Sequence, residues 1–275
     1  MERASDVLEL APVLRARGEA FALATVVSTV AATAAKAGAK AIVKSDGTIS
    51  EGWIGGGCAR GAVMKAAREA IADGHARLIS VQPPDVLQEH GVSAGEEREG
   101  VRFAKNTCPS HGTMDIFIEP VLPRPQIVLC GSSPVAAAIA DFARRLGFSV
   151  TVCAPAAEQG AFSDVDRRID DYDLPAAGAG ERFIVVSTQS RGDEKALHAA
   201  LMTDARYVAF VGSRLKAATL KAALAARGVD AARLAALRSP AGLDIGAIGP
   251  EEIALSILAE IVAVRRGRDP RGTQA

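Results

Sequence analysis

Residues 126–153 read QIVLCGSSPVAAAIADFARRLGFSVTVC, and this stretch decides the fold of the second half of the chain. A short apolar strand at 126–130 precedes a helix at 134–146, which stops at Gly147, and a second apolar strand follows at 149–153. Strand, helix and strand in this order form a β-α-β unit, in which the crossover returns the second strand parallel to the first. The stretch therefore predicts a parallel sheet covered by helices.

The remainder of the second half continues this alternation. The last helix has the clearest boundaries, with Gly249 as the N-cap and Pro250 at the first helical position. A Rossmann-like domain with a parallel sheet is therefore expected. Its further elements are predicted as strands at 183–187 and 207–211 and helices at 193–202, 215–226 and 250–266.

The first half has a different pattern, with a hairpin signal at Asp46-Gly47 between two strands. The apolar run at 21–30 reads as a strand buried on both faces, whereas 82–105 is polar and reads as a loop in which helical content is left open. We expect a mixed sheet. Its further elements are predicted as helices at 5–17 and 62–71 and strands at 39–44, 49–54, 78–81 and 114–119.

Three prolines, Pro120, Pro123 and Pro125, separate the two halves at the density of a linker. We therefore divide the chain into a mixed-sheet domain at 1–122 and a Rossmann-like domain at 123–275, both of the α/β class. A ligand cleft is expected between them, because domain interfaces often form small-molecule sites.

Composition excludes several classes of function. The 32 Lys and Arg residues balance the 32 Asp and Glu residues, which argues against a nucleic-acid-binding surface. Only 4% of residues are aromatic, which disfavours carbohydrate binding, and the apolar stretch at 20–35 is too short for a membrane span. The four cysteines form no C-x-x-C pair and the N-terminus has no secretory signal, so a reducing cytoplasm is expected.

The turn Gly131-Ser132-Ser133-Pro134 occupies the position of a Rossmann dinucleotide loop. Ser133 replaces the usual second glycine, Pro134 removes an amide donor, and no acidic residue directly follows the strand that ends at Cys153. Three interpretations stay open, namely a structural turn, a site for another phosphate-bearing ligand, and an NAD site.

The glycine run Gly55-Gly56-Gly57 leads into Cys58 between a strand and a helix. Glycines permit close approach and a helix N-terminus lowers a thiol pKa, so this turn suits a soft metal or a sulfur-bearing ligand. The alternative is a flexible turn with a buried, inert cysteine.

A second cysteine, Cys108, lies near His111. These two ligands do not complete a zinc site, which needs four, so a solvated loop is the alternative.

Two polar, glycine-containing loops, 187–194 and 211–216, follow predicted strands at the carboxyl edge of the parallel sheet. They carry Arg191, Arg214 and Lys216, which could line a phosphate pocket. Surface basic residues at helix starts would explain each of them equally well.

Several ordered blocks together resemble the xanthine dehydrogenase accessory family, the XdhC/CoxI-type molybdenum-cofactor chaperones. The resemblance spans residues 8 to 266. The blocks are Gly38 to Val43 with Asp46-Gly47, Ile54 to Cys58, Thr188 to Glu194, Phe210 to Lys216, Ser239 to Ala247 and Pro250 to Ala254.

Members of that family bind the molybdenum cofactor, protect it and help deliver its sulfurated form to molybdenum hydroxylases such as xanthine or carbon monoxide dehydrogenase. The resemblance therefore implies a cytoplasmic maturation factor without turnover of its own that serves such a hydroxylase. Its implied ligand is molybdopterin, with the cytosine dinucleotide form left open. A cysteine desulfurase and a second copy of the chain are further candidate partners.

The resemblance and the loops together assign a set of cofactor-binding residues, in which Cys58 is also the candidate metal ligand. The alternative function is an NAD(P)-dependent oxidoreductase, suggested by the β-α-β unit alone, although the resemblance does not favour NAD(P) as the cofactor. The assigned residues are Gly55, Gly56, Gly57, Cys58, Cys108, Gly131, Ser132, Ser133, Arg191, Gly212, Ser213 and Lys216.

Overall fold

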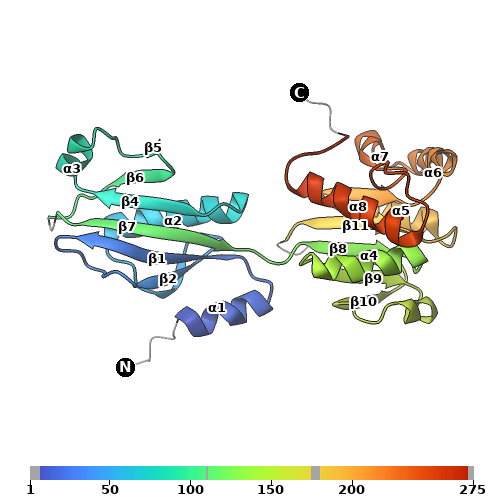
Figure 1. The fold of residues 1–275 in the computed structure, drawn as a ribbon, viewed down its shortest axis with the longest axis horizontal. Coiled ribbons are helices and arrows are strands. Elements are labelled where there is room, and N and C mark those ends of the chain that lie inside the picture. The colour runs from blue at the N-terminus through green and yellow to red at the C-terminus, as the bar shows by residue number, and fades with distance from the viewer. Residues whose placement is uncertain (1–6, 110, 175–179, 272–275) are drawn as a thin grey trace. The chain divides into compact units, whose positions relative to one another are not determined.

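The structure, a computed structural model, describes residues 7–109, 111–174 and 180–271. The chain forms two compact units, Met1–Pro123 and Arg124–Ala275 (Figure 1). Each unit has its own sheet and its own hydrophobic core. No helix within the described ranges is long and apolar enough to cross a membrane.

The N-terminal unit is built on a seven-stranded sheet with the order β3-β2-β1-β7-β4-β6-β5. Strands β4 and β6 run parallel and the other neighbours run antiparallel, which confirms the predicted mixed sheet. The strands are β1 (Phe21–Val30), β2 (Lys40–Lys44), β3 (Ile49–Gly52), β4 (Arg77–Gln82), β5 (Glu97–Arg98), β6 (Val101–Lys105) and β7 (Thr113–Val121). The helices are α1 (Val7–Ala16), α2 (Gly57–Asp73) and α3 (Pro84–Glu89).

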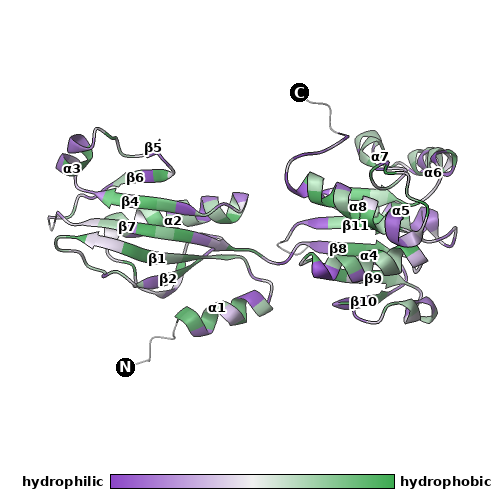
Figure 2. Ribbon diagram, viewed as in Figure 1, coloured by the Kyte–Doolittle hydropathy of each residue, from purple (hydrophilic) through white to green (hydrophobic). Residues whose placement is uncertain are grey.

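Helix α2 covers one face of this sheet. Its small side chains, such as Ala66 and Ala67, allow close packing against Ile116 and Ile118 of β7, which are fully buried. Burying an isoleucine side chain contributes about 1.5–3 kcal/mol. Figure 2 shows that β1 and β7 are hydrophobic over much of their length, as this packing requires.

The prediction that the strand at 21–30 is buried on both faces is wrong. Side chains alternate between the faces of a strand, and in β1 those of Ala24 and Val26 point to the α2 core. On the opposite face Phe21 packs under α1, whereas Val27 is 50% exposed. Trp53, the single tryptophan of the chain, follows β3 and is also exposed.

Two further expectations for this unit need correction. Helix α2 begins at Gly57, earlier than the predicted residue 62, so Gly57 and Cys58 belong to its first turn. In the stretch 82–105, α3 agrees with the helical content that the sequence leaves open, but the strands β5 and β6 were not expected. Pairing of β6 with the buried strand β4, a long-range contact, stabilises this weakly patterned segment as a strand. Residues 5 and 6 of the predicted first helix lie outside the described ranges.

The C-terminal unit contains a five-stranded sheet with the order β10-β9-β8-β11-β12, in which every neighbouring pair is parallel. The predicted Rossmann-like architecture is thus confirmed. The strands are β8 (Gln126–Cys130), β9 (Ser149–Ala154), β10 (Arg167–Asp170), β11 (Arg182–Val186) and β12 (Tyr207–Phe210). The helices are α4 (Pro134–Arg145), the 3₁₀ helix η1 (Ala156–Ala161), α5 (Asp193–Leu201), α6 (Arg214–Ala226), α7 (Ala231–Ala236) and α8 (Pro250–Arg265).

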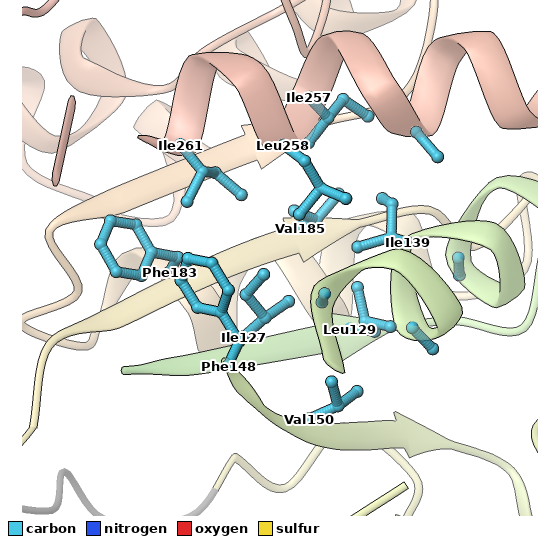
Figure 3. Packing of buried hydrophobic residues seen from close by; sticks show 14 of the residues in the cluster. Ile127, Leu129, Ile139, Phe148, Val150, Phe183, Val185, Ile257, Leu258 and Ile261 are labelled. Carbon is cyan, nitrogen blue, oxygen red and sulfur yellow. The ribbon is translucent and has the colours of Figure 1, made fainter. Parts of the chain in front are cut away.

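Helices α4 and α8 pack on one face of this sheet, and Figure 3 shows their contacts with the strands. Ile261 of α8 lies near Phe183, and Ile139 of α4 lies near Leu129. The rings of Phe148 and Phe183 meet edge to face at 5.9 Å between centroids. Helices α5 and α6 bury Leu197 and Leu224 in a second core. The sequence analysis missed η1, β10 and α7, which are all too short to show a clear periodicity.

Candidate functional site

The N-terminal unit has a cavity of about 190 Å³ where α2 begins. Both cysteines that the sequence analysis singled out, Cys58 and Cys108, line this cavity, and the thioether of Met114 lies on its wall. The structure therefore brings three sulfur-containing side chains to one small cavity. Its wall also includes Thr33, Gly56, Gly57, Asn106 and Thr107.

The environment of Cys58 favours the thiolate. Its Sγ lies 3.0 Å from Thr107 Oγ1, and the Thr107 amide donates a hydrogen bond to the same sulfur at 3.4 Å. These hydrogen bonds hold the pKa of Cys58 below its ordinary value of 9.0, although desolvation and the neighbouring Cys108 oppose the shift. Cys58 is only partly buried, so the part of the alternative that expected a buried cysteine is wrong.

The three glycines before Cys58 have separate roles. Gly55 has a left-handed backbone with φ of +110°, and a Cβ at this position would lie 3.2 Å from Cε of Met114. Added Cβ atoms at Gly56 and Gly57 would meet nothing within 4 Å. Gly56 is the N-cap of α2 and supplies no side-chain cap to the first-turn amides.

Asn106 fixes the loop that carries Cys108. Its Oδ1 accepts a hydrogen bond from the Cys108 amide at 2.9 Å, and its Nδ2 donates one to the Gly112 carbonyl at 2.6 Å. His111 is exposed and does not line the cavity, and no group of three or more His, Cys, Asp or Glu side chains suited to a metal is found in the described part of the chain. The sequence analysis missed Asn106 and Thr107. They directly follow β6, so recognising that strand would have indicated them.

In the C-terminal unit, the turn after β8 is closed by its own hydrogen bonds. Gly131 has φ of +109°, and a Cβ there would collide with the carbonyl of Ser187. Ser133 Oγ accepts from the Ala136 amide at 3.1 Å and shares a 2.6 Å hydrogen bond with Ser187 Oγ. Ser133 therefore caps α4 and joins β8 to the β11 loop at the point where the strand order reverses.

The 3₁₀ helix η1, which follows β9, brings an acidic residue, Glu158, to this turn. Glu158 Oε2 accepts a 2.7 Å hydrogen bond from Ser132 Oγ, and its Oε1 lies 3.0 Å from Nη1 of Arg191. The sequence analysis missed Glu158 because it looked only at the residues immediately after the strand at 149–153. Glu158 thus links three loops at the carboxyl edge of the sheet.

The structure separates the three candidate cations. Arg191 pairs with Glu158, and Lys216 pairs with the buried Asp193 and donates to Ser190 Oγ at 2.8 Å. Arg214, in contrast, has no hydrogen-bond or ion-pair partner among the residues that the structure describes, and it lines a cavity. Two of the three candidate cations of the predicted phosphate pocket are therefore already paired within the chain.

This second cavity has a volume of about 900 Å³ and lies at the carboxyl end of β12. Residues 239–247, an irregular segment before α8, form much of its wall together with Gly212, Arg214 and Arg271. Gly242 of this wall contacts Glu260, which is fully buried. Glu260 accepts hydrogen bonds from the Tyr207 hydroxyl at 2.6 Å and the Gly242 amide at 3.0 Å. Its other carboxylate oxygen lies 2.6 Å from Nε of Arg271.

Comparison with known proteins gives two family matches. The XdhC Rossmann domain matches residues 127–261, and the XdhC and CoxI family matches residues 14–82. The first match covers the parallel-sheet unit, and the second includes the glycine run and Cys58.

Two curated relatives share part of the sequence. The uncharacterized protein YqeB of Escherichia coli is 28% identical over 236 residues, which cover 82% of this chain and 40% of that protein. A probable xanthine dehydrogenase subunit of Bacillus subtilis is 29% identical over 162 residues, 56% of this chain and 47% of that protein. The matched part of this chain thus spans less than half the length of either relative.

A solved structure from Bacillus halodurans, described as a xanthine dehydrogenase, is 20% identical with a TM-score of 0.46 and covers 97% of this chain and 98% of its own. The two family matches lie in different units and in the expected order along the chain. The chain belongs to the XdhC and CoxI family.

Proposed function

We propose that this protein is a maturation factor for a molybdenum hydroxylase of the xanthine dehydrogenase type, and that it binds the molybdenum cofactor at the cavity lined by Cys58 and Cys108. The observation that carries the proposal is the placement of both thiols, with Thr107 hydrogen-bonded to one of them, in a single cavity at the start of α2. The B. subtilis relative, whose name refers to a xanthine dehydrogenase, supports the choice of client.

The donors in this cavity suit the group. Thiolates and thioethers are soft ligands, and a molybdenum–dithiolene centre is itself a sulfur-rich, soft group. A cavity of about 190 Å³ is smaller than the ~300–1,000 Å³ of sites that enclose a whole small molecule, so it would hold the metal end of the cofactor. When bound, the cofactor would supply the redox-active metal that the client enzyme needs.

The residues of the chain have separate roles in this proposal. Cys58 provides the thiolate, and Thr107 stabilises its negative charge through two hydrogen bonds. Asn106 holds the Cys108 loop against the cavity. Gly56 and Gly57 leave space for backbone amides to approach a ligand. A cysteine desulfurase is the proposed source of sulfur, and a second copy of the chain is a proposed partner.

Cofactor retention tests this proposal. The full chain is purified from cells that make the cofactor, and bound molybdenum and pterin are measured by metal analysis and mass spectrometry. We expect the parent protein to retain both, Cys58→Ser to retain severalfold less, and Cys108→Ser to show a smaller loss. Reconstitution of an apo-hydroxylase with each variant at matched folded concentration measures delivery.

If Cys58→Ser retains and delivers the cofactor as well as the parent, the thiolate role is wrong. Circular dichroism of each variant excludes unfolding as the cause of a loss, because Cys58 is partly exposed and its replacement should leave the fold intact.

An NAD(P)-dependent oxidoreductase is the second candidate, and Glu158 is the observation that favours it. An acidic side chain at the first Rossmann turn can bind ribose hydroxyls in a dinucleotide site. In this structure Glu158 is already engaged with Ser132 and Arg191. Micromolar NAD(P) binding without cofactor retention would favour the oxidoreductase.

A further inference from the structure

We propose that the larger cavity of the C-terminal unit binds a mononucleotide, with its phosphate at the start of α6 beside Arg214. The proposal concerns a different unit from the cysteine cavity and does not depend on the cofactor role of that cavity.

Size and lining argue for an organic ligand with one charged end. A volume of about 900 Å³ lies within the ~300–1,000 Å³ typical of small-molecule sites and far exceeds the space that inorganic phosphate needs. Ala241, Leu243 and Ile253 provide apolar wall, whereas Arg214 and Asp244 provide opposite charges. Such a lining suits a ligand that combines a phosphate with an uncharged body.

The start of α6 is suited to the phosphate. The helix has 13 residues, Ser213 is its N-cap, and the dipole of a helix favours an anion at this end. Arg214 is the first helical residue and has no partner among the described residues, so its guanidinium is available to a phosphate. Arg271 also lines the cavity, but Glu260 already neutralises it.

Asp244 and Ser239 argue for the nucleoside part. Asp244 is an exposed carboxylate on the wall, and carboxylates accept hydrogen bonds from ribose hydroxyls in many α/β nucleotide sites. Ser239, also on the wall, has a buried Oγ without a hydrogen-bond partner in the described part of the chain. Buried hydroxyls are nearly always paired, so Ser239 Oγ leaves one hydrogen-bonding position unfilled next to the cavity.

The turn that binds the phosphates in a standard Rossmann domain is less suited to a ligand here. Ser132 donates to Glu158, Ser133 is bonded to Ser187, and Pro134 has no amide hydrogen. The end of β12 is a different position at the same carboxyl edge of the parallel sheet, where open α/β sheets bind ligands. The cavity there is therefore the better candidate for the nucleotide.

Equilibrium dialysis of the full chain tests the proposal. AMP and CMP are compared with adenosine, cytidine and inorganic phosphate. We expect at least one nucleotide to bind, with its nucleoside and inorganic phosphate each on the order of tenfold weaker or more, because each lacks half of the contacts. Arg214→Gln should weaken nucleotide binding by a similar factor.

Arg227→Gln is the matched control, since it removes the same charge at the other end of α6, where Arg227 pairs with Glu194. The Arg227→Gln variant should bind the nucleotide with the same affinity as the parent protein. Ala247→Phe, which places a ring in the cavity without changing its charge, should also weaken binding.

Three results would overturn the proposal: no nucleotide binds, Arg214→Gln binds like Arg227→Gln, or inorganic phosphate binds as tightly as the nucleotides. Molybdenum retention, measured on the same preparations, is decided by Cys58 and so reports separately on the cofactor role.

Discussion

The two cavities differ in size and in the chemistry of their walls. The cavity of the N-terminal unit is small and carries sulfur from Cys58, Cys108 and Met114, whereas the cavity of the C-terminal unit is nearly five times larger and carries Arg214 and Asp244. Soft sulfur donors select soft metals, and a guanidinium at a helix start selects phosphate. The walls of the two cavities therefore differ in the kind of ligand that their chemistry would favour.

The largest expected effect is on the free energy of unfolding, when the buried Glu260 is replaced. Glu260→Gln removes the buried charge that pairs with Arg271 and keeps the Tyr207 and Gly242 donors satisfied. Arg271 is itself partly exposed, but the Gln amide would turn its NH2 toward the guanidinium, donor against donor. A buried donor left unpaired beside a charged group costs about 3 kcal/mol. We expect a loss of this size in urea unfolding followed by tyrosine fluorescence, since both tyrosines lie in the C-terminal unit. Glu194→Gln, at an exposed pair, should cost less than ~1 kcal/mol; equal losses would show that burial of Glu260 is unimportant.

The second prediction compares buried with cavity-lining cysteines. Cys130 and Cys153 face each other in register on β8 and β9 and are fully buried, and their contact and burial raise the pKa of the Cys130 thiol. A serine hydroxyl without a partner at either position should cost about 1–3 kcal/mol in chemical denaturation. Cys58→Ser should change stability by less than ~0.5 kcal/mol. A Cys153→Ser protein as stable as the parent would contradict this division.

The third prediction tests the cause of the lowered pKa of Cys58. Thr107→Val removes one of two hydrogen bonds to the thiolate, so the pKa should rise and alkylation should need a higher pH. The alkylation midpoint of Thr107→Val should therefore lie at a higher pH than that of the parent. The rate of iodoacetamide labelling against pH, read by mass spectrometry at Cys58, measures it. Thr219→Val, on the exposed surface of α6, is the control, and an unchanged midpoint in Thr107→Val would remove Thr107 as the cause.

The smallest effect is expected at Arg191. Arg191 is the largely exposed member of its pair with Glu158, so Arg191→Gln should cost less than ~1 kcal/mol in denaturation and less still at high salt. Nucleotide binding should not change in this variant, because Arg214 and not Arg191 lines the cavity. A loss of nucleotide binding in Arg191→Gln would move the phosphate site back to the turn after β8.

The sequence could predict the elements with a strong local pattern. The strand at 126–130 and the helix that Pro250 begins appear as expected, because apolar periodicity and helix caps are local signals. Strand β6 and the role of Glu158 depend on partners distant in the chain, Leu78 to Gln82 and Ser132 respectively, so local pattern could not reveal them. The meeting of Cys58 with Thr107, 49 positions apart, could not be predicted for the same reason.

The distribution of aromatic side chains gives the protein two optical labels. Trp53 lies in the N-terminal unit only three residues before Gly56, which lines the cysteine cavity, and Tyr172 and Tyr207 both lie in the C-terminal unit. Tryptophan emission excited at long wavelength therefore reports on one unit of the native, unlabelled chain. Tyr207, hydrogen-bonded to Glu260, reports on the other through its absorbance. Spectral changes that arise in the two units can thus be followed separately in one sample, without an attached dye.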